Sequence, residues 1–149
     1  MSYLVLDTDI ISGIIKEDPV IVGALQKEFA PSETRPYAIS IVTRAELSVV
    51  NHLNGWGQKK AATMALILGQ CLEVPIASDD IVQAFAEIEA FRRNKLIPGR
   101  PQLGRSVSMG ENDVWIAATT YVLGAELITA DADFECLNGV YFPVHRISR

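Results

Sequence analysis

Apolar residues recur along the chain in runs of two lengths, separated by polar turns. The short runs are rich in β-branched and aromatic residues and occupy residues 3–6, 37–42, 72–76 and 127–129. Uninterrupted apolar runs of this length are typical of strands buried on both faces, as in parallel sheets. Residues 140–147 predict a further short strand at the edge of the sheet.

The longer runs repeat apolar residues every three or four positions, the period of a helix with a buried face. They predict helices over residues 10–15, 20–30, 43–54, 58–72, 79–95 and 113–123. The segment 58–72 is so densely apolar that we expect it to be mostly buried.

Polar residues at the starts of these helices are the types that accept hydrogen bonds from free backbone N–H groups. The predicted N-caps are Asp9, Asp18 before Pro19, Thr43, Ser78 and Asn112. Thr43 and Glu46 also have the spacing of a capping box, which gives Glu46 a structural role.

Strands and helices alternate, which predicts an α/β fold with a doubly wound parallel sheet. The 149 residues fit one domain, residues 1–149, and 49% hydrophobic content with 21% charge is ordinary for a globular protein. Residues 96–110 are rich in proline and glycine and predict a long loop, a kind of segment that often carries function.

Composition and charge limit where the chain acts and what it binds. Two cysteines, Cys71 and Cys136, predict reduced thiols and a cytoplasmic protein, and we expect neither a secretion signal nor a membrane span. The net charge of −5 disfavours nonspecific nucleic-acid binding. One basic strip is the exception, because no acid lies between residues 90 and 111. It contains Arg92, Arg93, Lys95, Arg100 and Arg105.

Three acids are expected at one edge of the sheet. Asp7 ends the first strand, Glu46 lies in the helix after the second, and Asp131 follows the fourth. Ligands of parallel sheets bind at this carboxyl edge. Asp113 opens the helix that leads into the fourth strand, and on this topology we expect it at the opposite edge.

Most of these acids also have a structural interpretation. Asp113 is favoured by the dipole at a helix N-terminus, and Asp131 and Asp133 are common turn residues. Asp7 is different, because an acid that adjoins a buried strand needs hydrogen-bond partners or a metal ion.

Four segments carry a family resemblance. They are Leu-Asp-Thr-Asp at 6–9, Val-Thr-Arg-Ala-Glu-Leu at 42–47, Glu-Asn-Asp-Val-Trp-Ile-Ala-Ala at 111–118 and Leu-Ile-Thr-Ala-Asp-Ala-Asp-Phe at 127–134. In this order they resemble the motifs of PIN-domain ribonucleases, and more narrowly those of VapC-type toxins from toxin–antitoxin pairs. The third segment is the most specific.

The resemblance implies a PIN-like fold, a parallel sheet between helices, with Asp7, Glu46, Asp113 and Asp131 in one pocket. It therefore implies that Asp113 joins the other acids, and it favours Asp131 over Asp133. It also implies an RNA substrate, a homodimer and a cognate antitoxin that covers the pocket.

Clustered carboxylates repel one another, and hard divalent cations such as Mg²⁺ or Mn²⁺ bind oxygen ligands and keep them ionised. We expect Asp7 and Asp113 to hold the principal ion, with Asp131 and Glu46 completing the set. The threonines next to these acids, Thr8, Thr43 and Thr129, are candidates to orient them.

Two alternatives differ in class from a nuclease. Asp7-Thr-Asp9 also resembles the first motif of haloacid-dehalogenase-type phosphatases, in which the first Asp is a nucleophile. That chemistry needs a later lysine, and none follows Lys95. The second alternative is a catalytically silent PIN-fold protein that acts by binding a partner.

Overall fold

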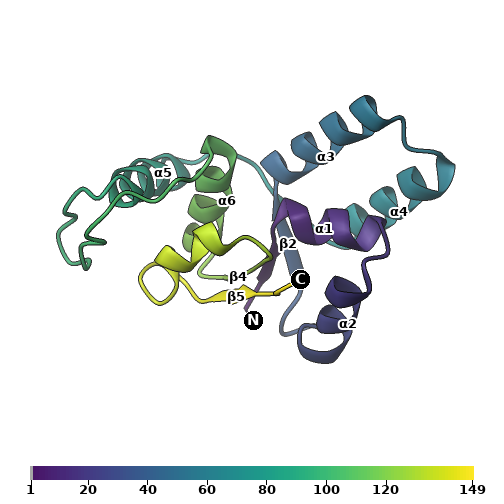
Figure 1. Cartoon of the computed structure of the whole chain (residues 1–149), viewed down its shortest axis with the longest axis horizontal. Coiled ribbons are helices and arrows are strands. Elements are labelled where there is room, and N and C mark those ends of the chain that lie inside the picture. Colours follow the sequence, from purple (N-terminus) through teal and green to yellow (C-terminus); the bar gives the residue numbers. More distant parts are fainter. Residues whose placement is uncertain (1) are drawn as a thin grey trace.

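Five strands form one parallel sheet at the centre of the fold (Figure 1). The computed structural model describes residues 2–149. The strands are β1 (Leu4–Leu6), β2 (Tyr37–Ser40), β3 (Leu72–Val74), β4 (Glu126–Thr129) and β5 (Val144–Arg146). They lie in the order β3-β2-β1-β4-β5, and every pairing is parallel. The predicted parallel sheet and its edge strand are confirmed.

Six α-helices and one 3₁₀-helix flank this sheet in the part of the chain from residue 2 onward. They are α1 (Thr8–Ile15), α2 (Pro19–Glu28), α3 (Ile41–Asn54), α4 (Gln58–Gly69), α5 (Asp79–Arg92), α6 (Glu111–Val122) and η1 (Ala132–Leu137). Figure 1 shows α1 to α4 on one side of the sheet and α5 and α6 on the other. The α/β fold is therefore confirmed, whereas η1 was not predicted.

Alternate residues of β1 contribute to two hydrophobic cores on opposite faces of the sheet. Leu4 and Leu6 of β1 pack with α1, α2 and Leu47 of α3. Val5, between them, faces the opposite core with Ile88 of α5 and Val114 of α6. All six residues are fully buried. Both faces of the sheet are covered, which explains why the strands read as unbroken apolar runs.

Two predicted helix starts are confirmed. Oδ1 of Asp18 accepts hydrogen bonds from the backbone N–H groups of Val20 (3.0 Å) and Ile21 (3.4 Å) at the start of α2. Oγ of Ser78 accepts one from the N–H of Ile81 (3.2 Å) at the start of α5.

Three other predicted caps are wrong because each helix begins earlier than expected. The residues that precede α1, α3 and α6 are Asp7, Ser40 and Gly110, in place of Asp9, Thr43 and Asn112. Oγ of Ser40 accepts from the N–H of Val42 (3.1 Å), so the backbone groups assigned to a Thr43–Glu46 capping box are already inside α3. Glu46 is thus in the second turn of its helix.

The prediction that residues 58–72 are mostly buried is also wrong. No residue of α4 is fully buried, and Leu66 is 64% exposed. Only one face of the helix, with Met64, Ile67 and Leu68, packs on the core shared with α1 and α2. Apolar density within a helix therefore did not indicate how many of its faces are covered.

Residues 96–110 contain no helix or strand, as predicted, but the loop already begins at residue 93 because α5 ends at Arg92. Two arginines attach loop 93–110 to the rest of the protein. Nη2 of Arg100 donates to the hydroxyl of Tyr121 (3.0 Å), and its guanidinium stacks 4.1 Å from the ring centroid of Tyr141. Nη1 of Arg92 donates to the carbonyl of Val107 (3.3 Å). These two members of the basic strip are engaged in structure.

The contact between α1 and α2 yields a prediction about stability. A Cβ on Gly13 would lie 2.2 Å from Cδ1 of Ile21, which is fully buried and has little room to move. Gly13→Ala is expected to destabilise the protein by about 1–3 kcal/mol through overpacking. Denaturant unfolding measures the change.

Gly23→Ala in α2 is the matched control, because a Cβ there meets no atom within 4 Å. This substitution is expected to leave stability unchanged or raise it by about 0.5–1 kcal/mol, since alanine favours a helix over glycine. Equal effects at the two glycines would contradict the described packing of α1 on α2.

Candidate active site

Asp7 lies at the carboxyl end of β1 and is 4% exposed. Its Oδ1 accepts a hydrogen bond from the backbone N–H of Thr8 (2.8 Å), and its Oδ2 accepts one from Oγ1 of Thr129 (2.7 Å). Leu6 of β1 pairs with Ile128 of β4, so the parallel register itself places Asp7 beside Thr129. The acid expected to need partners has two.

Glu46 reaches the same edge of the sheet from α3. Its Oε1 accepts a hydrogen bond from Oγ1 of Thr8 (2.6 Å), and its Oε2 accepts one from Nδ2 of Asn112 (3.4 Å). Oγ1 of Thr8 also lies 3.2 Å from Oγ1 of Thr43. Glu46 does not cap its own helix and instead extends between α1 and α6.

Asp113 lies in the first turn of α6, beside the other acids. The prediction that it would lie at the opposite edge is wrong. A helix that leads into a parallel strand from outside the sheet runs antiparallel to that strand. Its last turn therefore meets the start of the strand, and its first turn lies at the carboxyl edge. The N–H of Ala125, next to β4, accordingly donates to the carbonyl of Thr120 near the end of α6.

Asp131 follows β4 and starts η1. Its backbone N–H donates to Oγ1 of Thr129 (2.9 Å), and its Oδ1 accepts from the N–H of Asp133 (2.9 Å). Thr129 therefore joins Asp131 to Asp7 through a short chain of hydrogen bonds. Asp133 does not line the pocket that contains these two acids.

One pocket of about 270 Å³ collects all four predicted acids. It is lined by Asp7, Thr8, Asp9, Ser12, Glu46, Leu47, Val50, Asp113 and Asp131. The fifth acid, Asp9, was predicted to be a helix cap. Because α1 begins at Thr8, Asp9 lies in its first turn, and its Oδ2 accepts from the N–H of Ala130 (3.1 Å). The signal in the sequence that could have placed Asp9 in this pocket is its position two residues after Asp7.

Burial and mutual repulsion disfavour ionisation in this pocket. Burial raises the pKa of Asp7 well above its usual range, and the charges of Asp9 and Asp113 raise it further. Burial also raises the pKa of Asp9. The pKa of Asp113 rises to about 6, first through burial and then through the charges of Asp131 and Glu46. No lysine or arginine lines the pocket to compensate for these charges.

The donor set matches the chemistry of a hard divalent cation, which binds carboxylate oxygens and would supply the missing positive charge. Oδ1 of Asp9 is buried and has no hydrogen-bond partner among the described residues. No three acidic, histidine or cysteine side chains of residues 2–149 already have the arrangement of a complete metal site. Oε1 of Glu46 and Oδ2 of Asp7 accept hydrogen bonds from Thr8 and Thr129, and each of these oxygens keeps a second lone pair for an ion.

The remaining chemical candidates of the sequence lie elsewhere. The two histidines do not line the acid pocket, and Nε2 of His145 lies 2.6 Å from Oε1 of Glu126. Cys71 and Cys136 are free thiols, as predicted. No helix within residues 2–149 is long and apolar enough to cross a membrane.

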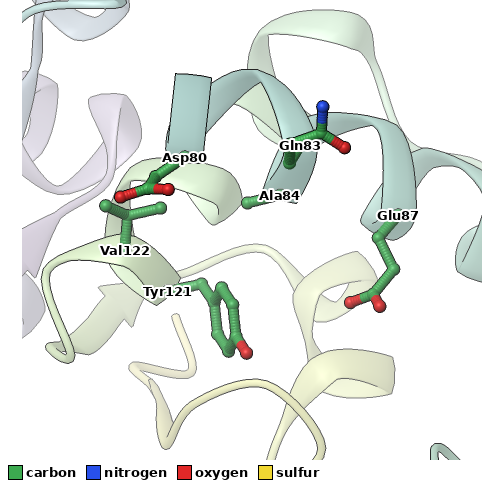
Figure 2. A pocket seen from close by; sticks show the side chains of 6 residues that line it. All are labelled: Asp80, Gln83, Ala84, Glu87, Tyr121 and Val122. Carbon is green, nitrogen blue, oxygen red and sulfur yellow. The ribbon is translucent and has the colours of Figure 1, made fainter. Parts of the chain in front are cut away.

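A larger pocket of about 610 Å³ lies between α5 and α6 and contains none of the four acids (Figure 2). Its lining combines two acids with an aromatic ring and small or apolar side chains. The residues are Asp80, Gln83, Ala84, Glu87, Tyr121 and Val122. Arg100 of loop 93–110 contacts two of these residues, Tyr121 and Glu87.

A family model described as PIN domain matches residues 4–139. Comparison with curated protein sequences found no match. The matched range includes all four predicted acids and the whole of loop 93–110.

Solved structures show the same fold at low sequence identity. A chain of VapBC2 from Rickettsia felis, bound to a promoter DNA fragment, has a TM-score of 0.68 and 18% identity, covering 97% of this chain and 98% of that one. A toxin–antitoxin complex from Klebsiella pneumoniae gives 0.65 and 23%, covering 97% and 99%. FitAcB from Neisseria gonorrhoeae gives 0.67 and 21%, covering 96% of each chain.

The raised pKa of Asp113 predicts how the metal-free protein responds to pH. A pKa of about 6, above the usual 3.8, means that the folded protein binds this proton more tightly than the unfolded chain does. The charged Asp113 carboxyl therefore lowers the free energy of unfolding. This effect is absent below about pH 4 and complete above about pH 6. Asp113→Asn in EDTA should raise the free energy of unfolding by roughly 1–2 kcal/mol at pH 8, after allowance for solvent screening, and much less near pH 4.5.

Urea unfolding at the two pH values measures this difference. Glu111→Gln is the matched control, because Glu111 is an exposed acid in the same first turn of α6 and lies outside the pocket. Its loss should be neutral or slightly destabilising through the helix dipole. Destabilisation by Asp113→Asn at both pH values would show that the cluster does not strain the fold.

Proposed function

The chain belongs to the PIN-domain family, and we propose that it is a metal-dependent endoribonuclease that acts as the toxin of a VapBC-type toxin–antitoxin pair. The observation that carries the proposal is the single pocket containing Asp7, Glu46, Asp113 and Asp131 at the carboxyl edge of the sheet. Clustering of buried and half-buried carboxylates in a pocket that no lysine or arginine lines is unfavourable for stability and is a mark of functional sites.

In this proposal the acids divide into two pairs. Asp7 and Asp113 hold a Mg²⁺ or Mn²⁺ ion, which would offset the burial and repulsion that raise the pKa of each in the metal-free pocket. Glu46 and Asp131 complete the set directly or through water. When bound, the ion activates water for attack on the phosphodiester and stabilises the charge that develops on the phosphate.

The residues around the acids hold them in place. Thr129 donates to Asp7, and Thr8 donates to Glu46, so two hydroxyls hold the carboxylates of two different elements. Oγ1 of Thr43 lies 3.2 Å from Oγ1 of Thr8. The pocket has no cysteine, lysine or histidine to act as a nucleophile or acid. In the proposed mechanism water attacks the phosphodiester, and the carboxylates are the groups available to receive its proton.

RNA phosphates need basic residues outside this acidic pocket. Arg92 and Arg100 are removed from the candidates by their structural contacts. Lys95 and Arg105 of the basic strip are exposed and have no ion pair among the described residues, so we assign phosphate or base contacts to them.

The toxin assignment rests on similarity. The solved chains with this fold come from toxin–antitoxin complexes, including those from Rickettsia felis and Klebsiella pneumoniae. We propose by analogy that an antitoxin is the protein partner of this chain, that the chain forms a homodimer and that it acts on RNA in the cytoplasm. The alternative phosphatase chemistry has no support in a pocket without a lysine.

Cleavage of total RNA by the purified protein tests the enzymatic proposal. We expect cutting in Mg²⁺ or Mn²⁺ and none in EDTA. Asp7→Asn should reduce the cleavage rate by at least about 100-fold, because loss of even an indirect metal contact typically reduces activity 10- to 100-fold. Asparagine remains a good N-cap for α1, so the variant should fold.

Asp80→Asn, in the pocket between α5 and α6, is the matched control and should cut as the wild type does. Cutting that persists in EDTA, or in Asp7→Asn, would contradict the proposed mechanism. A folded protein that binds Mg²⁺ but cuts only a defined RNA would narrow the substrate. A folded protein that binds no ion would favour the silent binding alternative.

A further inference from the structure

A second pocket is lined by two charged residues that have no role in the acid pocket or in structural contacts of the basic strip. Arg105 comes from loop 93–110, and Asp133 comes from η1. The pocket has a volume of about 500 Å³, within the range of sites that hold small ligands. Its lining thus joins the long loop to the turn that follows β4.

This pocket adjoins the acid cluster through the backbone. Asp131 lines the acid pocket, and its Oδ1 accepts a hydrogen bond from the N–H of Asp133 (2.9 Å). The two acids therefore lie in one short turn that borders both pockets. The acid pocket and the second pocket are neighbours along this turn.

The walls of the second pocket are partly apolar. Leu103, Val107 and Cys136 are half-buried in its lining. Burial raises the pKa of the Cys136 thiol, so this wall is uncharged at neutral pH. Such walls suit the flat face of a base.

The charged side chains of the pocket include both positive and negative groups. Glu135 is engaged with Nη1 of Arg146 (3.2 Å). The side chains of Arg105 and Asp133 are exposed and make no hydrogen bond or ion pair with the rest of residues 2–149. The pocket therefore offers an unused guanidinium and an unused carboxylate.

We propose that this pocket holds a guanine base of the RNA, next to the cleaved phosphate. Guanine presents two acceptors, O6 and N7, which match the guanidinium fork of Arg105. It also presents N–H donors at N1 and N2, which match a carboxylate that only accepts, that of Asp133. Adenine presents a donor in place of O6, uracil presents a single N–H donor, and cytosine has an amino group but no ring N–H. None of the three therefore offers a pair of adjacent acceptors and a pair of adjacent donors, as guanine does.

This inference rests on the proposed ribonuclease function and extends it to the choice of cleavage site. Asp133 is then a specificity residue instead of a fifth ligand in the acid cluster. In this inference loop 93–110 contributes to RNA recognition through Arg105, whereas Arg92 and Arg100 of the basic strip make structural contacts.

Binding of short labelled RNAs in EDTA tests the inference without cleavage. The probes are uridine oligonucleotides that carry one guanosine, inosine or adenosine at the same place, and fluorescence anisotropy reports the Kd. The wild type is expected to bind the guanosine probe about 10- to 100-fold more tightly than the adenosine probe. Inosine, which lacks the N2 amino group, should fall between them.

Variants separate the two contacts. Asp133→Ala should abolish the difference between guanosine and inosine, because the partner of the N2 amino group is gone. Arg105→Ala should reduce the difference between guanosine and adenosine. Lys95→Ala, the matched control in the same loop, should weaken binding of all three probes equally.

Equal binding of the three probes by the wild type, or an unchanged preference in both pocket variants, would overturn the inference. The Mg²⁺ cleavage assay keeps this failure apart from failure of the proposed function. RNA cutting without a guanine preference overturns the pocket and leaves the nuclease standing. A guanine preference in EDTA without any cutting supports the pocket and overturns the nuclease.

Discussion

The parallel pairing of β1 with β4 is the constraint on which the rest of the site depends. The register that joins Leu6 to Ile128 brings Asp7 beside Thr129, and their hydrogen bond (2.7 Å) lies in the buried edge of the sheet. From these two residues the chain turns into α1 and into η1. Asp9 and Asp131, one on each side, are therefore held near Asp7 by the sheet itself and not by loops.

The acids at this sheet edge destabilise the metal-free protein. Charges from α1, α3, α6 and the turn after β4 converge on a half-buried pocket, and the carboxyls respond with raised pKa values. Elsewhere the protein follows ordinary rules, with two apolar cores and Asp18 and Ser78 as helix caps. Local conflict confined to one pocket is typical of a site under selection for function. A bound cation is the simplest compensation, since it replaces repulsion between carboxylates by attraction to a shared charge.

The sequence predicted the strands and the identity of the pocket acids because buried strands and motif residues are local signals. It failed where a property depended on tertiary direction or partners. Asp113 joins the other acids because α6 runs antiparallel to β4. The topology expected from the sequence placed the first turn of this helix at the wrong edge of the sheet. Glu46 lost its capping role because Ser40 starts the helix earlier. Arg100 resembled a phosphate ligand, but its stacking on Tyr141 depends on a fold that no charge count reveals.

Mn²⁺ soaked into crystals of the protein, and located by its anomalous scattering, tests the central claim most directly. The account predicts one strong peak in the acid pocket, about 2.0–2.2 Å from carboxylate oxygens that include those of Asp7 and Asp113. Loss of that peak in Asp7→Asn crystals of the same form would assign it to the cluster. A pocket that stays without an ion at millimolar Mn²⁺, with Asp7 still bonded only to Thr8 and Thr129, would contradict the account.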